Sequence, residues 1–334
     1  MSRRVTIDDV AEVAGVSYQT VSRVINDKPE VSPATRQRVQ NVITELGYRP
    51  SRVARSLATA RTATIGLVVP DVANPYFSDI AHGVEQSAYE RGYSLLLCNT
   101  NEAPQREVEV LQMLDDKQVD GVIVCGLRQS GAPLRSALAR LPATVLVNRQ
   151  LEGLALSTVM VDDVTGGFLA TAHLLQSGHR AIGYVAGPRT SDSSRRRAVG
   201  YGRALAEQSI MPADDWIRYC APVVEDGLAA TQRLLAEHAE LTALFCYNDL
   251  VAVGALQACK RLGLDVPGDM AIVGYDDIQL AALMTPSLTT CYVPRLEIGR
   301  LALELLLDQI DADGQKYDVI TIHPQLIIRE SAPG

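Results

Sequence analysis

The chain has 334 residues, of which 47% are hydrophobic and 21% charged, values typical of a globular protein with two or three structural units. No apolar run approaches the roughly 20 residues of a membrane-spanning helix, and the first residues lack the apolar stretch of a secretion signal. The six cysteines have no CxxC spacing, which argues against a zinc site or a disulfide framework and favours a reducing compartment. The composition therefore predicts a cytoplasmic protein with no membrane partner.

Charge is divided unevenly along the chain, whose formal net charge is −8 at pH 7. Residues 1–61 carry ten Lys and Arg against six Asp and Glu, whereas the rest of the chain has a net charge of −12. A small basic segment on an acidic body favours contact between that segment and a polyanion.

The first 48 residues predict three short helices. Thr6 and Asp9 match a capping box, and Gly15 stands where the first helix has to end in a left-handed residue. An Ala-Gly-Val turn separates the first two helices, as in a helix-turn-helix unit. The other boundaries come from residues that favour helix starts and ends, at Ser17, Asn26, Ser32-Pro33 and Gly47.

The second helix has two distinct faces. Val21 and Val24 face inward, whereas Tyr18, Gln19 and Arg23 face outward. Gln can bind adenine and Arg can bind guanine through two hydrogen bonds each, and both can reach base edges from a major groove. The pattern favours DNA binding over an ordinary three-helix domain with a solvated polar face.

Residues 5–11 (VTIDDVA) and 14–24 (AGVSYQTVSRV) closely resemble the head of the LacI/GalR family of regulators, with a lac-repressor-like recognition helix. The resemblance implies that Tyr18, Gln19 and Arg23 read bases. It also implies that a second set of residues contacts the DNA backbone: Thr6, Ser17, Thr20, Asn26, Ser32, Thr35 and Tyr48.

The segment after Pro50 predicts a short helix from Ser51 to Ala58, within a linker of residues 49–62. A helix of this length is too short to persist alone in water, so we expect it to fold only against DNA and a partner chain. The family resemblance identifies it as a hinge helix that contacts the minor groove through Leu57 and Ala54.

From residue 63 onward, short β-branched strands alternate with helices. Two such series predict two doubly wound lobes of parallel sheet, with ligands bound at the carboxyl ends of the strands. The fold class is therefore α/β, a three-helix helix-turn-helix domain plus a hinge helix, followed by a two-lobed core.

The core resembles periplasmic sugar-binding proteins and matches the LacI/GalR core along its length, for example at Asn74-Pro75-Tyr76-Phe77 and Gly274-Tyr275-Asp276-Asp277. The resemblance gives residues 1–48 as the DNA-binding domain and 63–334 as the effector-binding and dimerisation core. The expected lobes are 63–161 with 292–322, and 162–291 with 323–331, joined by three crossings.

The resemblance carries over three effector-binding residues: Arg197, Asn248 and Asp276. Their side chains suit a polyol, because a carboxylate accepts from hydroxyls, an amide donates and accepts, and a guanidinium donates in a fork. Further lining of the cleft is expected from Tyr76, Phe77, Cys125, Asn148, Ser191, Ser193, Pro222 and Arg295.

Arg295 suggests the type of ligand. An additional cation in the cleft, with neutral Asn148 in place of an acidic neighbour, favours an anionic ligand. Val293-Pro294-Arg295 also resembles gluconate-type regulators of the family. We expect a sugar acid such as gluconate or a ketogluconate, with a neutral sugar as the next candidate. The alternative is that Arg295 pairs with Glu297 or another surface carboxylate.

Other classes of function lack their sequence signals. The chain has no G-x-S-x-G, Walker A, G-x-G-x-x-G or H-E-x-x-H motif, so we expect neither an enzyme nor a cofactor or metal site. The prediction is a homodimeric repressor of carbohydrate or sugar-acid genes, with a near-palindromic operator and an allosteric small-molecule effector. Whether the effector induces or co-represses is left open by the sequence.

Overall fold

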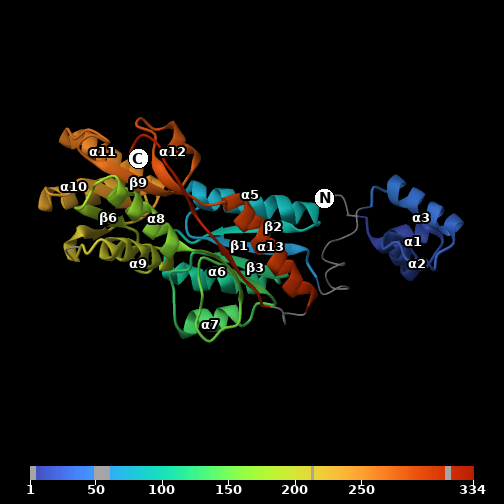
Figure 1. Cartoon of the computed structure of the whole chain (residues 1–334). Helices are drawn as coiled ribbons and strands as arrows, with labels where there is room; N and C mark the ends of the chain where they lie inside the picture. Colours follow the sequence, from blue (N-terminus) through green and yellow to red (C-terminus); the bar gives the residue numbers. More distant parts are fainter. Residues whose placement is uncertain (1–4, 49–60, 212–213, 313–316) are drawn as a thin grey trace. The chain divides into compact units, whose positions relative to one another are not determined.

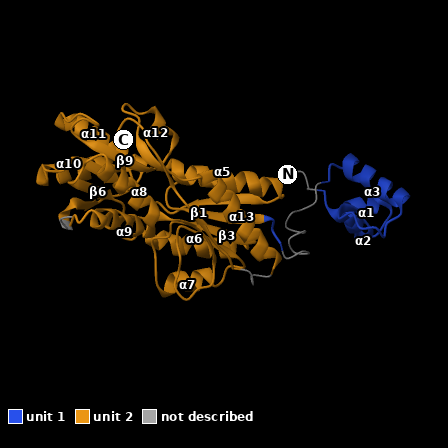
Figure 2. Cartoon of the chain, viewed as in Figure 1, with its two compact units in different colours: residues 1–63 blue, residues 64–334 orange. Residues whose placement is uncertain are grey.

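The computed structural model describes residues 5–48, 61–211, 214–312 and 317–334, and the chain divides between Ala63 and Thr64 into two compact units. Figure 2 shows the two units in different colours. The predicted hinge helix, with Ala54 and Leu57, lies outside the described residues.

The first unit contains the three expected helices, α1 (Ile7–Ala14), α2 (Tyr18–Ile25) and α3 (Pro33–Glu45). The predicted capping box is confirmed: the amide of Thr6 donates to Asp9 Oδ2 at 2.7 Å, and the amide of Asp9 donates to Thr6 Oγ1 at 3.3 Å. Gly15 ends α1 in the left-handed region, with φ 65°. Three valines from the three helices, Val10, Val21 and Val39, are fully buried and form the centre of the small core.

The second unit contains two six-stranded sheets, one in each lobe. All strand pairs of the first sheet are parallel. Its strand order is β11-β5-β4-β3-β1-β2, with β1 (Thr64–Val69), β2 (Ser94–Asn99), β3 (Gly121–Cys125), β4 (Thr144–Val147), β5 (Ser157–Val161) and β11 (Val319–Ile322). The helices of this lobe are α5 (Pro75–Glu90), α6 (Pro104–Asp116), α7 (Ala132–Leu138) and α13 (Arg295–Asp311).

The second sheet is parallel except at its edge, where β12 runs antiparallel to β10. Its order is β12-β10-β9-β8-β6-β7, with β6 (Ile182–Ala186), β7 (Ile217–Tyr219), β8 (Ala243–Cys246), β9 (Ala271–Asp276), β10 (Thr289–Tyr292) and β12 (Gln325–Ile327). Its helices are α8 (Asp163–Gln176), α9 (Asp192–Glu207), α10 (Val224–Glu237), α11 (Asp249–Leu262) and α12 (Gln279–Leu283), with a 3-10 turn at Asp214–Trp216.

The chain passes between the two sheets three times, after β5, after β10 and between β11 and β12. After the second crossing, α13 returns to the first lobe and lies beside α5 (Figure 1). Glycines permit this close approach, because a Cβ on Gly83 would lie 2.2 Å from the carbonyl oxygen of Leu296. The arrangement brings the carboxyl ends of β1, β3, β4, β6, β8 and β9 to the region between the lobes.

Candidate functional site

The outward face of α2 carries the three predicted base readers. Tyr18 is 51% exposed, and Gln19 and Arg23 are also exposed, whereas Val21 and Val24 of the same helix are buried. The side chains that remain free for a ligand are therefore those whose chemistry suits base edges.

The residues predicted to contact the DNA backbone lie at helix ends of the first unit. Ser17 caps α2 by accepting from the amide of Thr20 at 3.2 Å, and Ser32 caps α3 by accepting from the amide of Thr35 at 3.3 Å. Asn26 donates to the carbonyl oxygen of Ser22. Helix N-termini with hydroxyl caps are suited to phosphate, which is the role predicted for these residues and for Thr6 and Tyr48.

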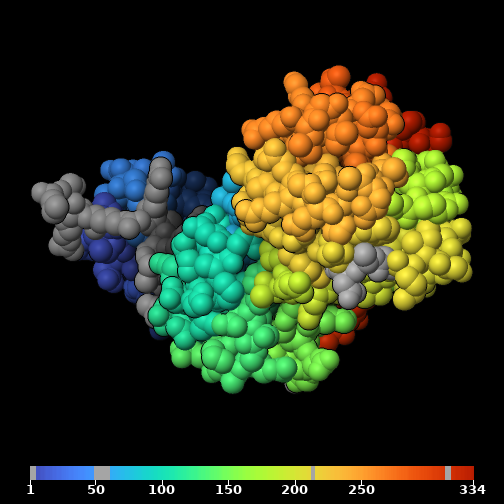
Figure 3. All heavy atoms as spheres, turned by 90° about the vertical axis from the view of Figure 1, so that its left-hand side faces the viewer, coloured from blue at the N-terminus to red at the C-terminus, as the bar shows by residue number. Residues whose placement is uncertain are grey.

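In the second unit, residues of both lobes line a narrow cleft with a cavity of about 20 Å³. The first lobe, mainly teal and green in Figure 3, and the second lobe, mainly yellow and orange, lie against each other on the face shown. Eight of the predicted effector residues line the cleft: Tyr76, Phe77, Asn148, Ser193, Arg197, Pro222, Asn248 and Asp276.

Arg197 is a buried cation of this cleft, with only 3% of its surface exposed. Its Nε donates to Asp163 Oδ1 at 2.8 Å, and its guanidinium lies 3.4 Å from the centre of the Tyr275 ring. Burial alone would lower the pKa of Arg197, but Asp163 and its other neighbours hold the pKa well above its ordinary value. Arg197 therefore stays charged in a fixed position.

Asp276, at the end of β9, is held in the left-handed region with φ 103° and is 4% exposed. Burial raises the pKa of its carboxyl to about 7, against the opposing effect of Arg197 and Arg295. Asp276 Oδ1 lies 3.8 Å from Arg197 Nη2. Near neutral pH the carboxyl exists in both protonation states, so it can donate to a ligand or accept from one.

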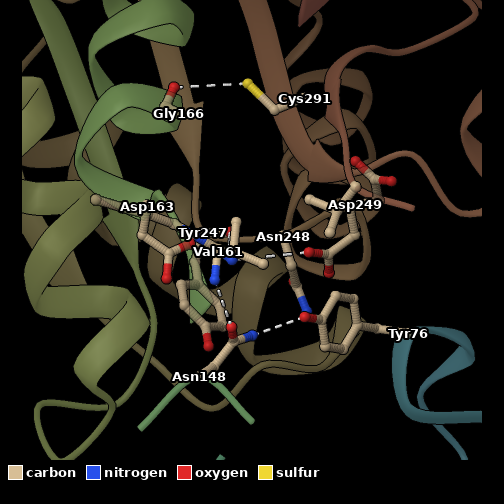
Figure 4. Close-up of polar contacts among 12 residues, drawn as sticks. Tyr76, Asn148, Val161, Asp163, Gly166, Tyr247, Asn248, Asp249 and Cys291 are labelled. Carbon is tan, nitrogen blue, oxygen red and sulfur yellow. Dashed lines mark hydrogen bonds and ion pairs between the residues drawn. The ribbon is translucent and has the colours of Figure 1, made fainter. Parts of the chain in front are cut away.

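Asn148 connects the first lobe to the crossing that leads into the second. Its Nδ2 donates to the Tyr76 hydroxyl at 2.7 Å, and its Oδ1 accepts from the amide of Val161 at 3.0 Å. Figure 4 shows these contacts with the Tyr76 ring pointing toward Asn148. These two hydrogen bonds fix the orientation of the Asn148 amide group, with Nδ2 toward the Tyr76 hydroxyl.

Asn248 caps α11 by accepting from the amide of Val251 at 2.9 Å. The neighbouring Asp249 is fully buried; it accepts from Thr290 Oγ1 at 2.6 Å and from the amide of Ile278 at 2.8 Å. Burial raises the pKa of Asp249 well above its usual value. Asp249 lies outside the cleft lining and holds the start of α11 to the loop that follows Asp276.

Three residues expected in the cleft are not among the described residues that line it. Cys125 is buried within β3, and Ser191 caps α9 with its hydroxyl 3.2 Å from that of Tyr247. The correction that matters most concerns Arg295, which donates to Asp79 Oδ2 at 2.8 Å and to the carbonyl oxygen of Asp276. Its charge is therefore compensated outside the cleft. This matches the alternative that Arg295 pairs with a surface carboxylate, and the carboxylate is that of Asp79, not Glu297.

Five further residues line the cleft that were not expected there from the sequence: Asn74, Glu102, Gly126, Arg128 and Tyr247. All five follow strand ends, which is the signal that could have identified them. Arg128 is the important omission, because it is a buried cation whose Nε and Nη2 donate to the two oxygens of Glu102 at 2.7 and 3.0 Å.

Within the described ranges no helix is long and apolar enough to cross a membrane. In the same part of the chain, no three His, Cys, Asp or Glu side chains are grouped so as to hold a metal ion.

Two family models together match most of the chain. The model of periplasmic binding proteins and the sugar-binding domain of the LacI family matches residues 62–330, and that of bacterial regulatory proteins of the lacI family matches residues 6–51.

Curated relatives extend along almost the whole chain. The HTH-type transcriptional repressor PurR of Haemophilus influenzae (strain PittEE) is 41% identical over 333 residues and covers 98% of both chains. The ribose operon repressor of Haemophilus influenzae (strain ATCC 51907 / DSM 11121 / KW20 / Rd) is 38% identical over 327 residues, with the same coverage.

Solved structures share the fold. The lac repressor dimer bound to operator and the anti-inducer ONPF is 28% identical, with a TM-score of 0.88, and covers 99% of this chain and 100% of its own. The complex of the transcriptional regulator CelR with cellobiose is 33% identical, with a TM-score of 0.75, and covers 98% of this chain and 100% of its own.

Proposed function

Because the chain belongs to the LacI family of bacterial regulatory proteins, we propose that it represses transcription by binding a near-palindromic operator as a dimer. Members of this family are DNA-binding repressors with an effector domain and not enzymes. The observation that carries the proposal is the exposure of Tyr18, Gln19 and Arg23 on one face of a capped helix whose other face is buried.

The two base-reading side chains with the strongest chemical preference are Gln19 and Arg23. In a major groove, Gln19 would bind adenine and Arg23 guanine, each through two hydrogen bonds. In a symmetric dimer, two such helices reach half-sites about 10 base pairs apart, centre to centre.

Substitution of Arg23 tests the operator proposal. We expect Arg23→Ala to reduce the preference for a duplex selected from random DNA by about 1–3 kcal/mol, because a bidentate contact to guanine is lost. Arg38→Ala removes the same charge from an exposed position of α3 and should weaken binding to selected and scrambled duplexes alike. Gel-shift titrations at fixed salt measure both, and equal effects of the two variants would contradict the role of Arg23.

The cleft supports a neutral effector better than an anionic one. Each cation that lines it is paired with a carboxylate, Arg128 with Glu102 and Arg197 with Asp163. Arg295, on which the expectation of a sugar acid depended, is engaged by Asp79. The remaining polar groups of the lining suit hydroxyl or ring-nitrogen partners.

We therefore propose a neutral, hydrogen-bonding metabolite with an apolar face that contacts Tyr76 and Phe77. Both rings line the cleft, in an edge-to-face pair with centroids 5.1 Å apart. A purine, suggested by the PurR relatives, and a sugar, suggested by the ribose repressor and the CelR–cellobiose complex, both have this chemistry. Gluconate, the sugar acid expected from the sequence, is the anionic competitor.

Calorimetric titration of the full chain with hypoxanthine, guanine, ribose, cellobiose and gluconate discriminates among these ligands. We expect saturable binding by a neutral compound and loss of that binding in Asn248→Ala, while Gln112→Ala, at an exposed position of α6, leaves it intact. Binding of gluconate alone would return the effector to the sugar acids.

A further inference from the structure

A second and larger groove lies between the lobes. Its cavity volume is about 480 Å³, against about 20 Å³ at the first cleft. The first lobe contributes α7 and the loop after β4, and the second contributes the start of α9. Four of its lining side chains are arginines, Arg135, Arg149, Arg195 and Arg196, and we call it the arginine groove.

The arginines of this groove are only partly compensated. Asp192 is shared, since it forms an ion pair with Arg149 Nη1 at 2.9 Å and also pairs with Arg195. Arg196 lies 3.4 Å from Asp163, which already accepts from Arg197. Arg135 forms no ion pair with any residue in the described ranges, and the only other carboxylate of the lining is Glu152. Positive charge is therefore in excess.

Two of these guanidinium groups also have unsatisfied donors. The Nε atoms of Arg149 and Arg196 are buried, and neither has a hydrogen-bond partner among the described residues. The side chain of Arg149 is only 9% exposed, and its pKa is lowered by burial and then by the positive charge of Arg195. A buried cation with an unmet donor costs free energy, which an anion in the groove would reduce.

The arginine groove is separate from the effector cleft, because no residue lines both. The two are nevertheless built on the same segments. Asn148 lines the cleft and Arg149 the groove, and on α9 Arg197 lines the cleft and Arg196 the groove.

We propose that the arginine groove binds a phosphate monoester, with the phosphate held by arginines of both lobes. Guanidinium groups match phosphate oxygens in bidentate pairs, and a dianion compensates more than one of them. The cavity of about 480 Å³ in the groove leaves room for the sugar or nucleoside that carries the phosphate. Because the phosphate would bridge α7 and α9, binding of the ligand favours one relative position of the lobes. Any effect of this ligand on the effector cleft rests on the proposed function.

Calorimetry of the full chain at low salt, without DNA, tests the binding directly. Glucose 6-phosphate and AMP represent the two sources of the phosphate, with glucose and adenosine as their uncharged counterparts. We expect saturable binding of at least one phosphorylated compound and none of its counterpart. The double variant Arg135→Gln/Arg195→Gln should weaken this binding about tenfold or more, because charge-assisted hydrogen bonds are lost.

Arg203→Gln is the matched control, since Arg203 is an exposed arginine of α9 outside the groove lining. It should leave the affinity unchanged, and thermal unfolding of each variant checks that its fold is retained. The proposal is overturned if neither phosphate binds, if the double variant binds as well as the wild type, or if Arg203→Gln weakens binding equally. It is also overturned if Asn248→Ala, in the effector cleft, abolishes phosphate binding while the double variant retains it. None of these results bears on operator binding, which is measured separately.

Discussion

At the scale of single residues, the carboxyl of Asp276 links stability to ligand binding. Burial raises its pKa from an ordinary 3.8 to about 7. Between about pH 4 and pH 7, the carboxyl is therefore protonated in the folded protein and ionised in the unfolded chain. The folded state therefore loses stability from this group as the pH rises from about 4 to 7, and above pH 7 the loss stays constant. A charged, buried carboxylate lowers the stability of the folded protein, and binding sites often retain such groups because they are needed for function.

Asp276→Asn should accordingly stabilise the fold. We expect the free energy of unfolding of the variant, relative to wild type, to rise between about pH 4 and pH 7 and to stay level above pH 7. Urea unfolding across this range measures the difference. Asp116→Asn, which removes an exposed carboxylate from α6, serves as the control. If the gain shrinks as the pH rises, the assignment of the raised pKa to Asp276 is incorrect.

Arg197 and Arg295 show how far the sequence identifies the site. Arg197 is expected from the family resemblance, and the structure places it in the cleft. Arg295 matches a ligand position of the family but is drawn to Asp79. Asp79 lies on α5, 216 residues earlier in the chain. A pairing at such separation depends on how α13 packs on α5, and local patterns in the sequence do not contain that information.

At the scale of elements, glycines determine how closely helices pack. In α9, a Cβ on Gly200 would lie 2.1 Å from the carbonyl oxygen of Val164 and 2.6 Å from the amide nitrogen of Phe168, both in α8. Gly202, two residues later, has nothing within 4 Å of the same position. Because α9 also carries Arg197 and Ser193 into the cleft, a shift of α9 displaces the site.

Gly200→Ala should destabilise the protein by about 1–3 kcal/mol or more, because two backbones would have to separate. Gly202→Ala should be neutral or stabilising by up to about 1 kcal/mol, since it only improves helix propensity. Chemical unfolding of the two variants gives the comparison. Equal stabilities would mean that α8 and α9 do not approach each other as closely as described.

The helices of the first unit follow from local signals, whereas some elements of the second unit do not. Capping residues at Thr6, Ser17 and Ser32 mark helix starts that the structure confirms. From the sequence alone, β5 is not apparent as a strand, nor are α10 and α13 apparent as helices. β5 has only five residues, all buried, in a run whose alternation is indistinct. Short buried strands are set by their partners in the sheet, here β4 and β11, more than by their own pattern.

At the scale of the whole molecule, the crossings between the lobes allow a ligand to control their relative position. Asn148 ties the first lobe to the crossing at Val161, and Asp163 and Arg197 form a buried pair just beyond it. A ligand that contacts Asn148 and Asp276 together joins both lobes and favours one arrangement. If the ligand changes operator affinity, as proposed, thermodynamic linkage requires the operator to change the affinity for the ligand by the same factor.

The most direct test is an anisotropy titration of the full chain on its selected operator, with and without the ligand found by calorimetry. We expect the ligand to change operator affinity by about 5- to 150-fold in the wild type. In Asp276→Asn the operator should still bind while the change is largely lost, because the substitution lies in the cleft and leaves the first unit untouched. No preference for the selected duplex over a scrambled one, or an undiminished response in the variant, would contradict control of DNA binding by the cleft.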